Sequence, residues 1–600
     1  TFYREKQFKV GDEHIFWGKV AYNAYERDIK FDMRDHKKFE AGDEEMMKYP
    51  FIPIYILSEE LKKTWIKPLA FTKIIFNALK SSAEYITEVL SEPVRIANDL
   101  LDHKTAVLKM HYPRSIEDIE ITRQTLAFEE LFYLQLVMAL RKRSISSAEK
   151  GIHFVKIGEK FEILFKEHLG FELTGAQKKV IKEILGDMRS NKPMNRLLQG
   201  DVGSGKTIVA VFCFLVAAEN GYQSAFMCPT EILAEQHYKT LQYYFDKLGL
   251  KSVLLTGGQK KKHRETVLDE ISSGKAQVVV GTHALIQESV DFKSLGFTVI
   301  DEQHKFGVMQ RAKLKAKGNN PDVLVMTATP IPRTLSLTVY GDLDVSVIDE
   351  LPKNRKNIKT ALRGETDRLK VYKFIRDEIK KGRQAYIVYP IIEESEKLDL
   401  KSAVKHFEII KEEIFPDLRI GLVHGRLPWY EIDETIEAFK DKKLDILVST
   451  TVIEVGIDIP NATIMLIEEA QRFGLSQLHQ LRGRVGRGAE QSYCILMAES
   501  SGEISAERLK IMTETNDGFK ISETDLKLRG PGEFFGTRQS GALKFTAADL
   551  VKDMPLIEKA RDSAFKVVNE DPQLRSHENS NIREHFLTNY RESMELIKIA

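Results

Sequence analysis

The stretch LLQGDVGSGKT, from Leu197 to Thr207, is the part of the sequence that decides the fold. It matches the pattern G-x-x-x-x-G-K-[ST], with an apolar run before it and an apolar, helix-like run at 208–218 after it. In this setting the glycines let backbone N–H groups wrap a phosphate chain at the positive end of the next helix. Lys206 is then expected to reach the β- and γ-phosphates, and Thr207 to bind Mg²⁺. The alternative is a glycine turn that fits the pattern by accident. The predicted nucleotide-binding residues here are Gly200, Asp201, Gly203, Ser204, Gly205, Lys206 and Thr207.

The composition limits the classes of protein to which the chain can belong. Its 600 residues predict about three to five domains. A hydrophobic share of 42% and a charged share of 30% are typical of a soluble globular protein, and a net charge of +1 requires any basic groove to be local. The cysteines, Cys213, Cys228 and Cys494, lie too far apart for a disulfide framework or a zinc cluster, which favours a reducing, intracellular setting.

The sequence shows no targeting or membrane segment. Its longest apolar run is too short to cross a bilayer, and no secretory signal is visible. We therefore expect no membrane partner. The first residue is Thr rather than Met, which predicts that part of the N-terminal region is missing.

Changes in hydrophobic periodicity divide the chain into five predicted segments. Residues 1–57 alternate aromatic and β-branched residues with polar ones, which predicts a small β domain such as a barrel. Residues 58–150 have helical spacing and predict a helical connector. Residues 151–345 and 346–505 alternate short apolar strands with helical segments, which predicts two α/β domains with parallel sheets. Residues 506–600 form the last segment. The predicted fold class is multidomain α/β.

The strands predicted for the two α/β domains are short apolar runs. They are Leu197-Leu198, Ala225–Met227, Val253–Leu255, Val278–Val280, Val299-Ile300, Val323–Met326, Ala385–Tyr389, Ile420–Val423, Ile446–Val448, Ile464–Ile467 and Cys494–Met497. In the helical connector, Tyr112-Pro113 predicts a break and Ser115 an N-cap for a long helix. That helix is expected to end at Arg141-Lys-Arg143, with 144–150 as a linker.

A pair of acids ends one strand of the first α/β domain. Val299-Ile300 is followed by Asp301 and Glu302, and ligands of open α/β sheets bind beyond the carboxyl ends of the strands. Asp301 is expected to bind Mg²⁺, and Glu302 to orient or deprotonate the attacking water. An isolated Asp-Glu pair is more often a solvated strand end. The strand context and the upstream phosphate loop favour the catalytic interpretation.

Two further sequence motifs predict that ATP binds between two domains. Phe171-Glu-Leu-Thr174-x-x-Gln177 precedes the phosphate loop, and a glutamine amide can pair with the adenine edge as donor and acceptor. In the second half, the run Gln480-Leu-Arg-Gly-Arg484-Val-Gly-Arg487 offers guanidinium groups that suit the charge of a transferring γ-phosphoryl group. ATP binding and hydrolysis would then close and open the cleft. For Arg482, binding to nucleic acid alone stays an alternative.

These motifs resemble those of superfamily 2 helicases, and as a set they are similar to those of the RecG family of branch-migrating DNA helicases. The resemblance covers about 51–545 well and 1–50 loosely. Its motifs are Asp301-Glu-Gln-His304, Gly281-Thr-His-Ala-Leu285, Thr327-Ala-Thr-Pro-Ile-Pro-Arg-Thr334, Ser449-Thr-Thr-Val-Ile-Glu-Val-Gly-Ile-Asp458 and Arg529-Gly-Pro-Gly-Glu-Phe-Phe-Gly-Thr-Arg-Gln-Ser-Gly541.

The resemblance implies an ATP-dependent translocase on double-stranded DNA that remodels replication forks and Holliday junctions in recombination and repair. It implies two RecA-like domains, an OB-like wedge at 1–57 and a translocation motif at 529–541. It also implies ATP and Mg²⁺ as cofactors, branched DNA and single-strand-binding protein as partners, a monomer, and a bacterial cytoplasm with a place at the nucleoid. The catalytic residues it supports are Lys206, Asp301, Glu302, Gln480, Arg484 and Arg487.

A second set of residues takes its expected roles from the resemblance alone. These residues are expected to contact the DNA or to couple the ATP state to the grip on it. They are Thr230, Thr282, Gln303, His304, Thr327, Thr329, Arg333, Arg426, Thr450, Arg529, Arg538 and Gln539. In the wedge, Phe2 and Tyr3 are candidates for base stacking, and the alternative is that such aromatic residues fill the core. The chain departs from the family pattern at Lys305, Met309, Asn354 and Asn357, none of which removes a catalytic group.

Other classes remain as alternatives. A transcription–repair coupling factor shares the translocation motif, but Pro531 and Glu533 suit the RecG family better. A primosomal helicase needs a cysteine-rich zinc site, which three scattered cysteines cannot supply. A nucleic-acid-binding protein with an inactive ATPase is disfavoured by the intact catalytic set. RNA unwinding stays open, because recognition of the 2′-hydroxyl cannot be deduced from sequence.

Overall fold

The computed structural model of the chain divides into two compact units. One unit comprises residues 1–136 together with 544–600, and the other comprises residues 137–543. The structure describes residues 8–23, 28–39, 44, 48–53, 55–63, 68–148, 150–302, 306, 308–329, 343–352, 356–390, 404–450, 459–488, 490–499, 503–529 and 545–590.

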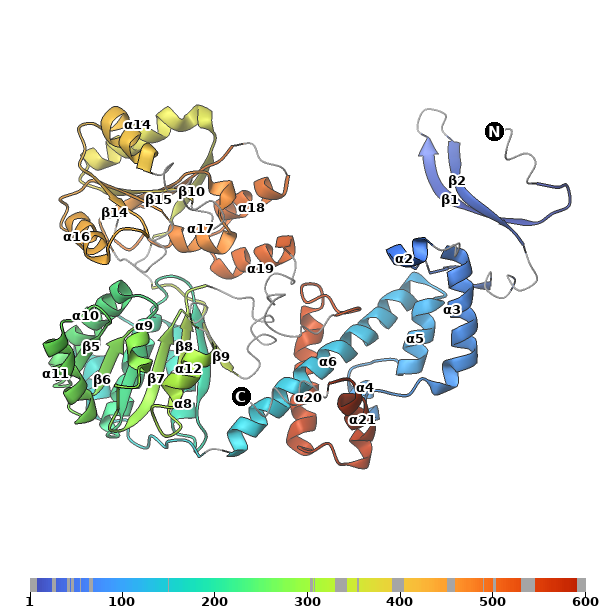
Figure 1. The fold of residues 1–600 in the computed structure, drawn as a ribbon, viewed down its shortest axis with the longest axis horizontal. Helices are drawn as coiled ribbons and strands as arrows, with labels where there is room; N and C mark the ends of the chain where they lie inside the picture. Colours follow the sequence, from blue (N-terminus) through green and yellow to red (C-terminus); the bar gives the residue numbers. More distant parts are fainter. Residues whose placement is uncertain are drawn as a thin grey trace. The chain divides into compact units, whose positions relative to one another are not determined.

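The first lobe of the larger unit, residues 151–352, is built on a parallel sheet (Figure 1). Its described strands lie in the order β5-β6-β4-β7-β8-β3-β9, and every described pair is parallel because helices form the crossovers. The strands are β3 (Asn195–Gly200), β4 (Gln223–Met227), β5 (Ser252–Leu255), β6 (Val278–Gly281), β7 (Leu295–Asp301), β8 (Asp322–Thr327) and β9 (Asp344–Ile348). The helices are α7 (Glu159–Ile163), η3 (Leu164–His168), α8 (Gly175–Met188), α9 (Lys206–Glu219), α10 (Glu231–Lys247), α11 (Lys261–Ser272), η4 (His283–Ile286) and α12 (Val308–Lys315).

Helices cover both faces of this sheet. One face carries Leu198, Phe226 and Met326 and packs against α8, α9 and α10. The opposite face carries Leu197 and Val325 and packs against α11, η4 and α12. All of 208–217 in α9 is buried, as expected for a helix that is apolar on every side. The helix that follows the phosphate loop is therefore fixed inside the lobe.

The second lobe, residues 356–529, repeats the architecture with described strands in the order β10-β15-β14-β11-β13-β12. The described pairs are again parallel. The strands are β10 (Lys359–Arg363), β11 (Gln384–Val388), β12 (Ile420–Val423), β13 (Ile446–Ser449), β14 (Ala462–Ile467) and β15 (Tyr493–Met497). The helical elements are η6 (Glu365–Asp367), α14 (Arg368–Lys380), η8 (Ile410–Ile414), α16 (Trp429–Lys440), η10 (Ala470–Arg472), α17 (Leu475–Arg482), α18 (Glu503–Glu514) and α19 (Gly518–Arg529).

The predicted fold class and all the predicted strands are confirmed, but sequence reasoning missed two edge strands. Among the described strands, β9 and β10 each lie at the edge of a sheet. In β10 no residue is buried, and in β9 only Ser346 and Ile348 are. A strand that is half solvated has no continuous apolar run, which is the signal used for the others.

The smaller unit combines a β ribbon with helices from both ends of the chain. Its elements are β1 (His14–Asn23), β2 (Asp28–Lys38), α2 (Glu59–Lys62), α3 (Pro68–Ser82), η2 (Ala83–Tyr85), α4 (Glu92–Ala97), α5 (His103–His111), α6 (Ile116–Ala148), α20 (Met554–Glu570), η11 (His577–Asn579) and α21 (Ser580–Asn589). The strands β1 and β2 are antiparallel. A Cβ atom on Gly18 would lie 2.0 Å from the backbone oxygen of Asp32, so the ribbon requires glycine there. Closure of this ribbon into a barrel stays a prediction, as does base stacking by Phe2 and Tyr3, which lie outside the described residues.

Helix α6 begins where the sequence predicts, after the predicted break at Tyr112-Pro113, but it ends later than predicted. Its first turn is capped by Ser115, whose Oγ accepts a hydrogen bond from Asp118 N at 3.0 Å. The helix continues to Ala148, so the prediction of an end at Arg141-Lys-Arg143 was wrong. The reason is that no glycine or proline follows within that stretch to stop it.

The C-terminal segment packs on α6 within the smaller unit. Arg123 forms two hydrogen bonds with the carboxylate of Asp553, at 3.0 and 2.9 Å. The Glu130 carboxylate accepts the backbone N–H groups of Thr546, Ala547 and Ala548. Asp553 immediately precedes α20, so these contacts fix the start of that helix against α6.

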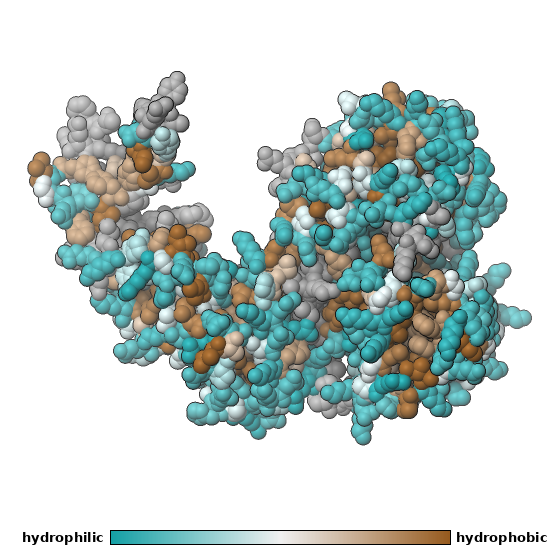
Figure 2. Space-filling model, turned by 180° about the vertical axis from the view of Figure 1, so that it is seen from behind, coloured by the Kyte–Doolittle hydropathy of each residue, from teal (hydrophilic) through white to brown (hydrophobic). Residues whose placement is uncertain are grey.

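Apolar side chains are gathered mainly inside the two units. On the face shown in Figure 2, hydrophilic residues cover most of the surface and hydrophobic residues form smaller patches. Within the part of the chain that the structure describes, every helix is too short or too polar to cross a bilayer.

The burial of Asp322 in the first lobe predicts how the free energy of unfolding depends on pH. Asp322 begins β8, and its Oδ1 accepts the backbone N–H of Met194 at 2.7 Å, while Oδ2 is buried without a hydrogen-bond partner among the described residues. Burial raises the pKa of Asp322 to about 8. This folded-state pKa lies above the ordinary value of 3.8, so the contribution of Asp322 to stability is fully present below pH 3.8 and is lost as pH rises towards 8.

Replacing Asp322 with Asn should therefore stabilise the protein at alkaline pH. The gap in free energy of unfolding between variant and wild type should widen by about 1.4 kcal/mol per pH unit between roughly pH 4 and pH 8. Urea unfolding at several pH values measures it, with the exposed Asp269→Asn as control. Parallel curves for wild type and Asp322→Asn would contradict the prediction.

Candidate nucleotide and nucleic-acid site

The phosphate loop joins β3 to α9 with two glycines in the left-handed region. Gly203 has φ of 77° and Gly205 has φ of 86°. A Cβ atom on Gly205 would lie 2.3 Å from Gln177 Nε2, so this position has no room for a side chain. Lys206 Nζ donates hydrogen bonds to the carbonyl oxygens of Gly200, at 2.8 Å, and Asp201, at 3.0 Å. Lys206 is thus hydrogen-bonded to the backbone of the same loop that is predicted to bind the phosphates.

The electrostatic surroundings of Lys206 are those expected for a phosphate-binding cation. Burial lowers the pKa of Lys206, and the charges of Glu302, Asp301 and Asp201 act against that shift. The side chain is only 8% exposed. The pKa of Lys206 stays below its ordinary value, and the neighbouring carboxylates offset only part of the cost of burying its charge.

The two acids at the end of β7, Asp301 and Glu302, lie together but differ in the direction in which their pKa values are shifted. Asp301 Oδ2 lies 3.1 Å from His237 Nε2 of α10. Burial would raise the pKa of Asp301, but the hydrogen bond from His237 and the charge of Lys206 outweigh it and keep the pKa below its ordinary value. Burial and the charge of Asp301 raise the pKa of Glu302 to about 6. The pair thus combines an ionised carboxylate with one that takes up a proton near neutrality, a division suited to separate roles.

The predicted adenine end opens into a cavity of about 1040 Å³. Phe171, Gln177 and Thr207 all line it. The Gln177 amide is already bonded: Oε1 accepts the N–H of Thr174 at 2.9 Å, and Nε2 donates to Ser204 O at 2.8 Å. Gln177 therefore fixes the start of α8 and the phosphate loop, a role that sequence reasoning did not assign. Its contact with adenine stays a prediction.

The second lobe brings Arg484 to the same site. Arg484 is buried, and its charge lowers the pKa of both Glu302 and Lys206. Gln480 is also buried, and Arg487 Nε donates to Gly483 O at 3.3 Å. The Arg484 guanidinium thus interacts electrostatically with Lys206 and Glu302, the two groups that are predicted to act on the γ-phosphate.

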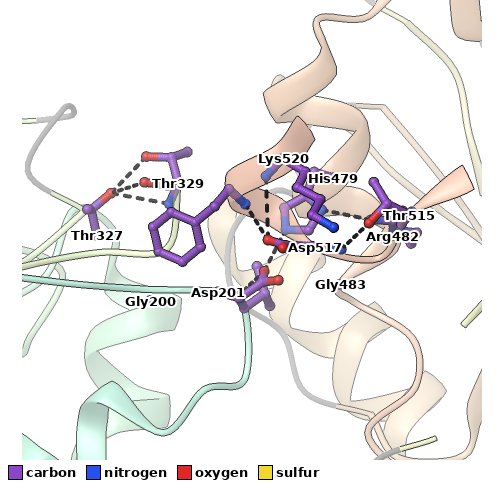
Figure 3. A network of polar contacts seen from close by, with 12 residues as sticks. Gly200, Asp201, Thr327, Thr329, His479, Arg482, Gly483, Thr515, Asp517 and Lys520 are labelled. Carbon is purple, nitrogen blue, oxygen red and sulfur yellow. Dashed lines mark hydrogen bonds and ion pairs between the residues drawn. The ribbon is translucent and has the colours of Figure 1, made fainter. Parts of the chain in front are cut away.

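Arg482 is buried in the second lobe and bonded to backbone. Its Nη1 donates to the carbonyl oxygens of Met512 and Thr515, both at 2.8 Å (Figure 3). Its Nη2 lies 3.0 Å from His479 Nδ1, and His479 Nε2 lies 2.5 Å from Asp201 Oδ1. Arg482 therefore serves packing inside this lobe rather than a nucleic-acid surface.

Comparison with known proteins agrees with this geometry. Three family models match in order: DEAD/DEAH box helicase at residues 174–338, Helicase conserved C-terminal domain at 368–489, and ATP-dependent DNA helicase RecG, domain 3, C-terminal, at 515–595. The ATP-dependent DNA helicases RecG of Thermotoga maritima and Bacillus subtilis are 46% and 45% identical to the chain. These matches cover 93% and 89% of the chain and 70% and 78% of the relatives. The chain belongs to the RecG family.

Other RecG relatives show how much of the family's length is present. The protein from Synechocystis is 49% identical over 89% of the chain, which spans 63% of that relative. A solved structure described as RecG bound to a three-way DNA junction is 43% identical, with a TM-score of 0.69. That match covers 92% of the chain and 72% of the solved protein. The resemblance inferred from the motifs is confirmed.

Some of the residues that the RecG-family resemblance predicts to face DNA lie near strand or helix ends, and the others lie outside the described residues. Thr230 caps α10, accepting Leu233 N at 3.4 Å. Thr282 and Thr450 follow β6 and β13, and their buried hydroxyls have no hydrogen-bond partner among the described residues. Thr327 and Thr329 are hydrogen-bonded through their hydroxyls at 2.7 Å, and Arg426 is exposed. Arg529 ends α19, and its side chain is not described. Gln303, His304, Arg333, Arg538 and Gln539 lie outside the described residues.

Sequence reasoning missed two histidines of the site. His237 orients Asp301 from α10, and His479 joins Asp201 to Arg482 from α17. Neither belongs to a motif used for the RecG resemblance. His479 does stand directly before the Gln480 motif, and that position was the available signal.

Proposed function

We propose that this chain is an ATP-driven translocase that acts on double-stranded DNA and remodels branched structures such as replication forks and Holliday junctions. The observation that carries the proposal is the convergence of Lys206, Glu302 and Arg484, from two RecA-like lobes, at one buried site. Membership of the RecG family supports branched DNA as the substrate, since the related solved protein is bound to a three-way junction.

The residues present fit a nucleotide with Mg²⁺. Thr207 offers a hydroxyl and Asp301 a carboxylate whose pKa stays low, and Mg²⁺ prefers oxygen ligands of this kind. Mg²⁺ would supply charge neutralisation between the phosphates. Lys206 would exchange its two loop carbonyls for phosphate oxygens, which suit its positive charge better.

Hydrolysis would then depend on groups from both lobes. Glu302 would accept the proton of the attacking water, a task that suits a carboxylate with pKa of about 6. Arg484 and Arg487 would neutralise charge on the transferring phosphoryl group. Because these groups lie on separate lobes, hydrolysis would change the contact between the lobes.

The finer parts of the proposal follow from family membership. Residues 1–57 would contribute the wedge, 58–150 its connector, and 506–600 the translocation motif with a C-terminal helical region. The lobes at 151–352 and 356–529 would correspond to the predicted 151–345 and 346–505, with β9 belonging to the first lobe and α18 and α19 to the second. The protein would act as a monomer in the bacterial cytoplasm at the nucleoid, with single-strand-binding protein as a partner.

The test is ATP hydrolysis with a model fork, a Holliday junction, plain duplex DNA, duplex RNA or no nucleic acid. Strong stimulation by branched DNA, with strand products that show regression, is the expected result. Preference for RNA would overturn the proposal, whereas stimulation by plain duplex alone would remove branch remodelling from it.

Arg529→Ala should separate hydrolysis from movement. DNA-stimulated hydrolysis should stay within about threefold of wild type, while fork regression should fall at least about tenfold, since a lever residue acts after the chemical step. Gel analysis of regressed products beside steady-state hydrolysis measures both. Equal loss of the two activities would make Arg529 a catalytic or folding residue instead.

A further inference from the structure

A continuous row of hydrogen bonds joins the phosphate loop to the turn between α18 and α19 (Figure 3). Asp201 contacts His479, His479 contacts Arg482, and Arg482 donates to the carbonyl oxygens that end α18 and precede α19. The side chains of His479 and Asp201 are 6% and 16% exposed, and Arg482 is 2% exposed. The row is therefore largely shielded from water, where hydrogen bonds are strongest.

These hydrogen bonds determine which ring nitrogen of His479 carries the hydrogen. A guanidinium nitrogen only donates hydrogen bonds, so His479 Nδ1 must accept from Arg482. The other ring nitrogen, Nε2, then carries the hydrogen and donates it to the Asp201 carboxylate. His479 is thus neutral, and both of its nitrogens are used. A side chain that lacks either the donor or the acceptor would interrupt the row.

Close packing also holds these two segments together, between the residue that follows Asp201 and the residue that follows Arg482. A Cβ atom added to Gly483 would lie 2.7 Å from Val202 Cβ. Asp201 and Val202 thus both contact the end of α17, one by a hydrogen bond and one by packing. A change in the backbone of the loop at this point must displace α17 or break these contacts.

Lys206 would link that backbone to a bound nucleotide. In this structure its Nζ donates to the carbonyl oxygen of Asp201 at 3.0 Å. If Lys206 turned to phosphate oxygens, the peptide group of Asp201 would lose this donor. The Asp201 side chain, which holds His479, belongs to the same residue.

We propose that His479 is a positioning residue that passes the nucleotide state of the phosphate loop, through Arg482, to the α18–α19 pair. The inference rests on the proposed function for its consequence, because α19 ends at Arg529, where the predicted translocation motif begins. His479 contributes no chemistry to hydrolysis. It makes the geometry of one lobe depend on the phosphate loop of the other.

The test compares two substitutions of one residue. The amide of His479→Gln retains one acceptor and one donor at a spacing similar to that of the ring nitrogens, whereas His479→Phe retains a ring with neither. The exposed His153→Phe, also in the larger unit, is the matched control. Fork strands displaced per ATP hydrolysed should fall about tenfold or more in His479→Phe and stay within about threefold in His479→Gln.

A second measurement does not depend on DNA. Hydrogen–deuterium exchange of residues 503–529 is followed with and without a non-hydrolysable ATP analogue. The analogue should change exchange there in wild type and His479→Gln, and not in His479→Phe. A change of the same size in His479→Phe would overturn the inference, even if wild type failed to remodel forks and the proposed function fell. Equal thermal melting of the variants excludes misfolding as the cause.

Discussion

Replacing Glu302 with Gln is expected to lower ATP turnover by about 10²–10⁴-fold while ATP still binds, which is the range for loss of a general base. The substitution preserves shape and removes only the ability to accept a proton. Glu302 is the suitable acceptor because burial and the neighbouring charge of Asp301 raise its pKa to about 6. Asp301 itself is committed to His237, which accounts for one of its oxygens.

The backbone at Glu302 supports the same assignment. Its φ is 52°, a conformation that costs energy for a residue other than glycine, and such strain is typical of functional positions. Its N–H donates to Asp301 Oδ1 at 3.1 Å, so the side chain leaves the strand in a fixed direction. The geometry is retained in the Gln variant, so its loss of turnover can be attributed to proton transfer.

Steady-state hydrolysis and the affinity for a fluorescent ATP analogue together measure this prediction. Turnover should fall with affinity changed by less than about threefold, because the uncharged amide removes no phosphate contact. The exposed Glu288→Gln, in the same lobe, is the control and should match wild type. Turnover within threefold of wild type in Glu302→Gln would show that another group is the base.

The sequence was sufficient for those parts of the site that are local. The phosphate loop and the Asp301–Glu302 pair each follow a buried strand, and parallel strands bring their carboxyl ends to one edge of the sheet. Neither histidine was predicted. His237 reaches Asp301 across 64 residues, and His479 reaches Asp201 across 278, from helices whose own patterns indicate only packing.

Other contacts that sequence reasoning missed have the same physical cause as the two histidines. Gln177 satisfies a helix N-terminus and the phosphate loop at once, a combination visible only when both are placed. Likewise, nothing near Glu130 in the sequence indicates that its carboxylate will bind the backbone at 546–548. Long-range hydrogen bonds carry no local pattern, whereas strands and loops do.

Lys206→Ala is expected to reduce ATP turnover by about 10³-fold or more, because it removes the cation that binds the phosphates. The loss has a second component in this protein. The charge of Lys206 lowers the pKa of Glu302 and of Asp301, so its removal makes both carboxyl groups easier to protonate. The variant therefore weakens the predicted base and the predicted Mg²⁺ ligand along with phosphate binding.

Binding to forked DNA should survive this substitution, because Lys206 is buried in the first lobe and is not among the residues predicted to face DNA. Fluorescence anisotropy with a labelled fork, at fixed salt, measures the affinity beside the hydrolysis assay. The exposed Lys261→Ala at the start of α11 is a control for loss of one positive charge from the same lobe, and it should retain turnover. Loss of fork binding with normal turnover in Lys206→Ala would show that this loop does not bind the nucleotide. Retained fork binding without ATP turnover would show that hydrolysis and DNA binding depend on separate parts of the protein. A translocase requires this separation if hydrolysis and DNA binding are to alternate.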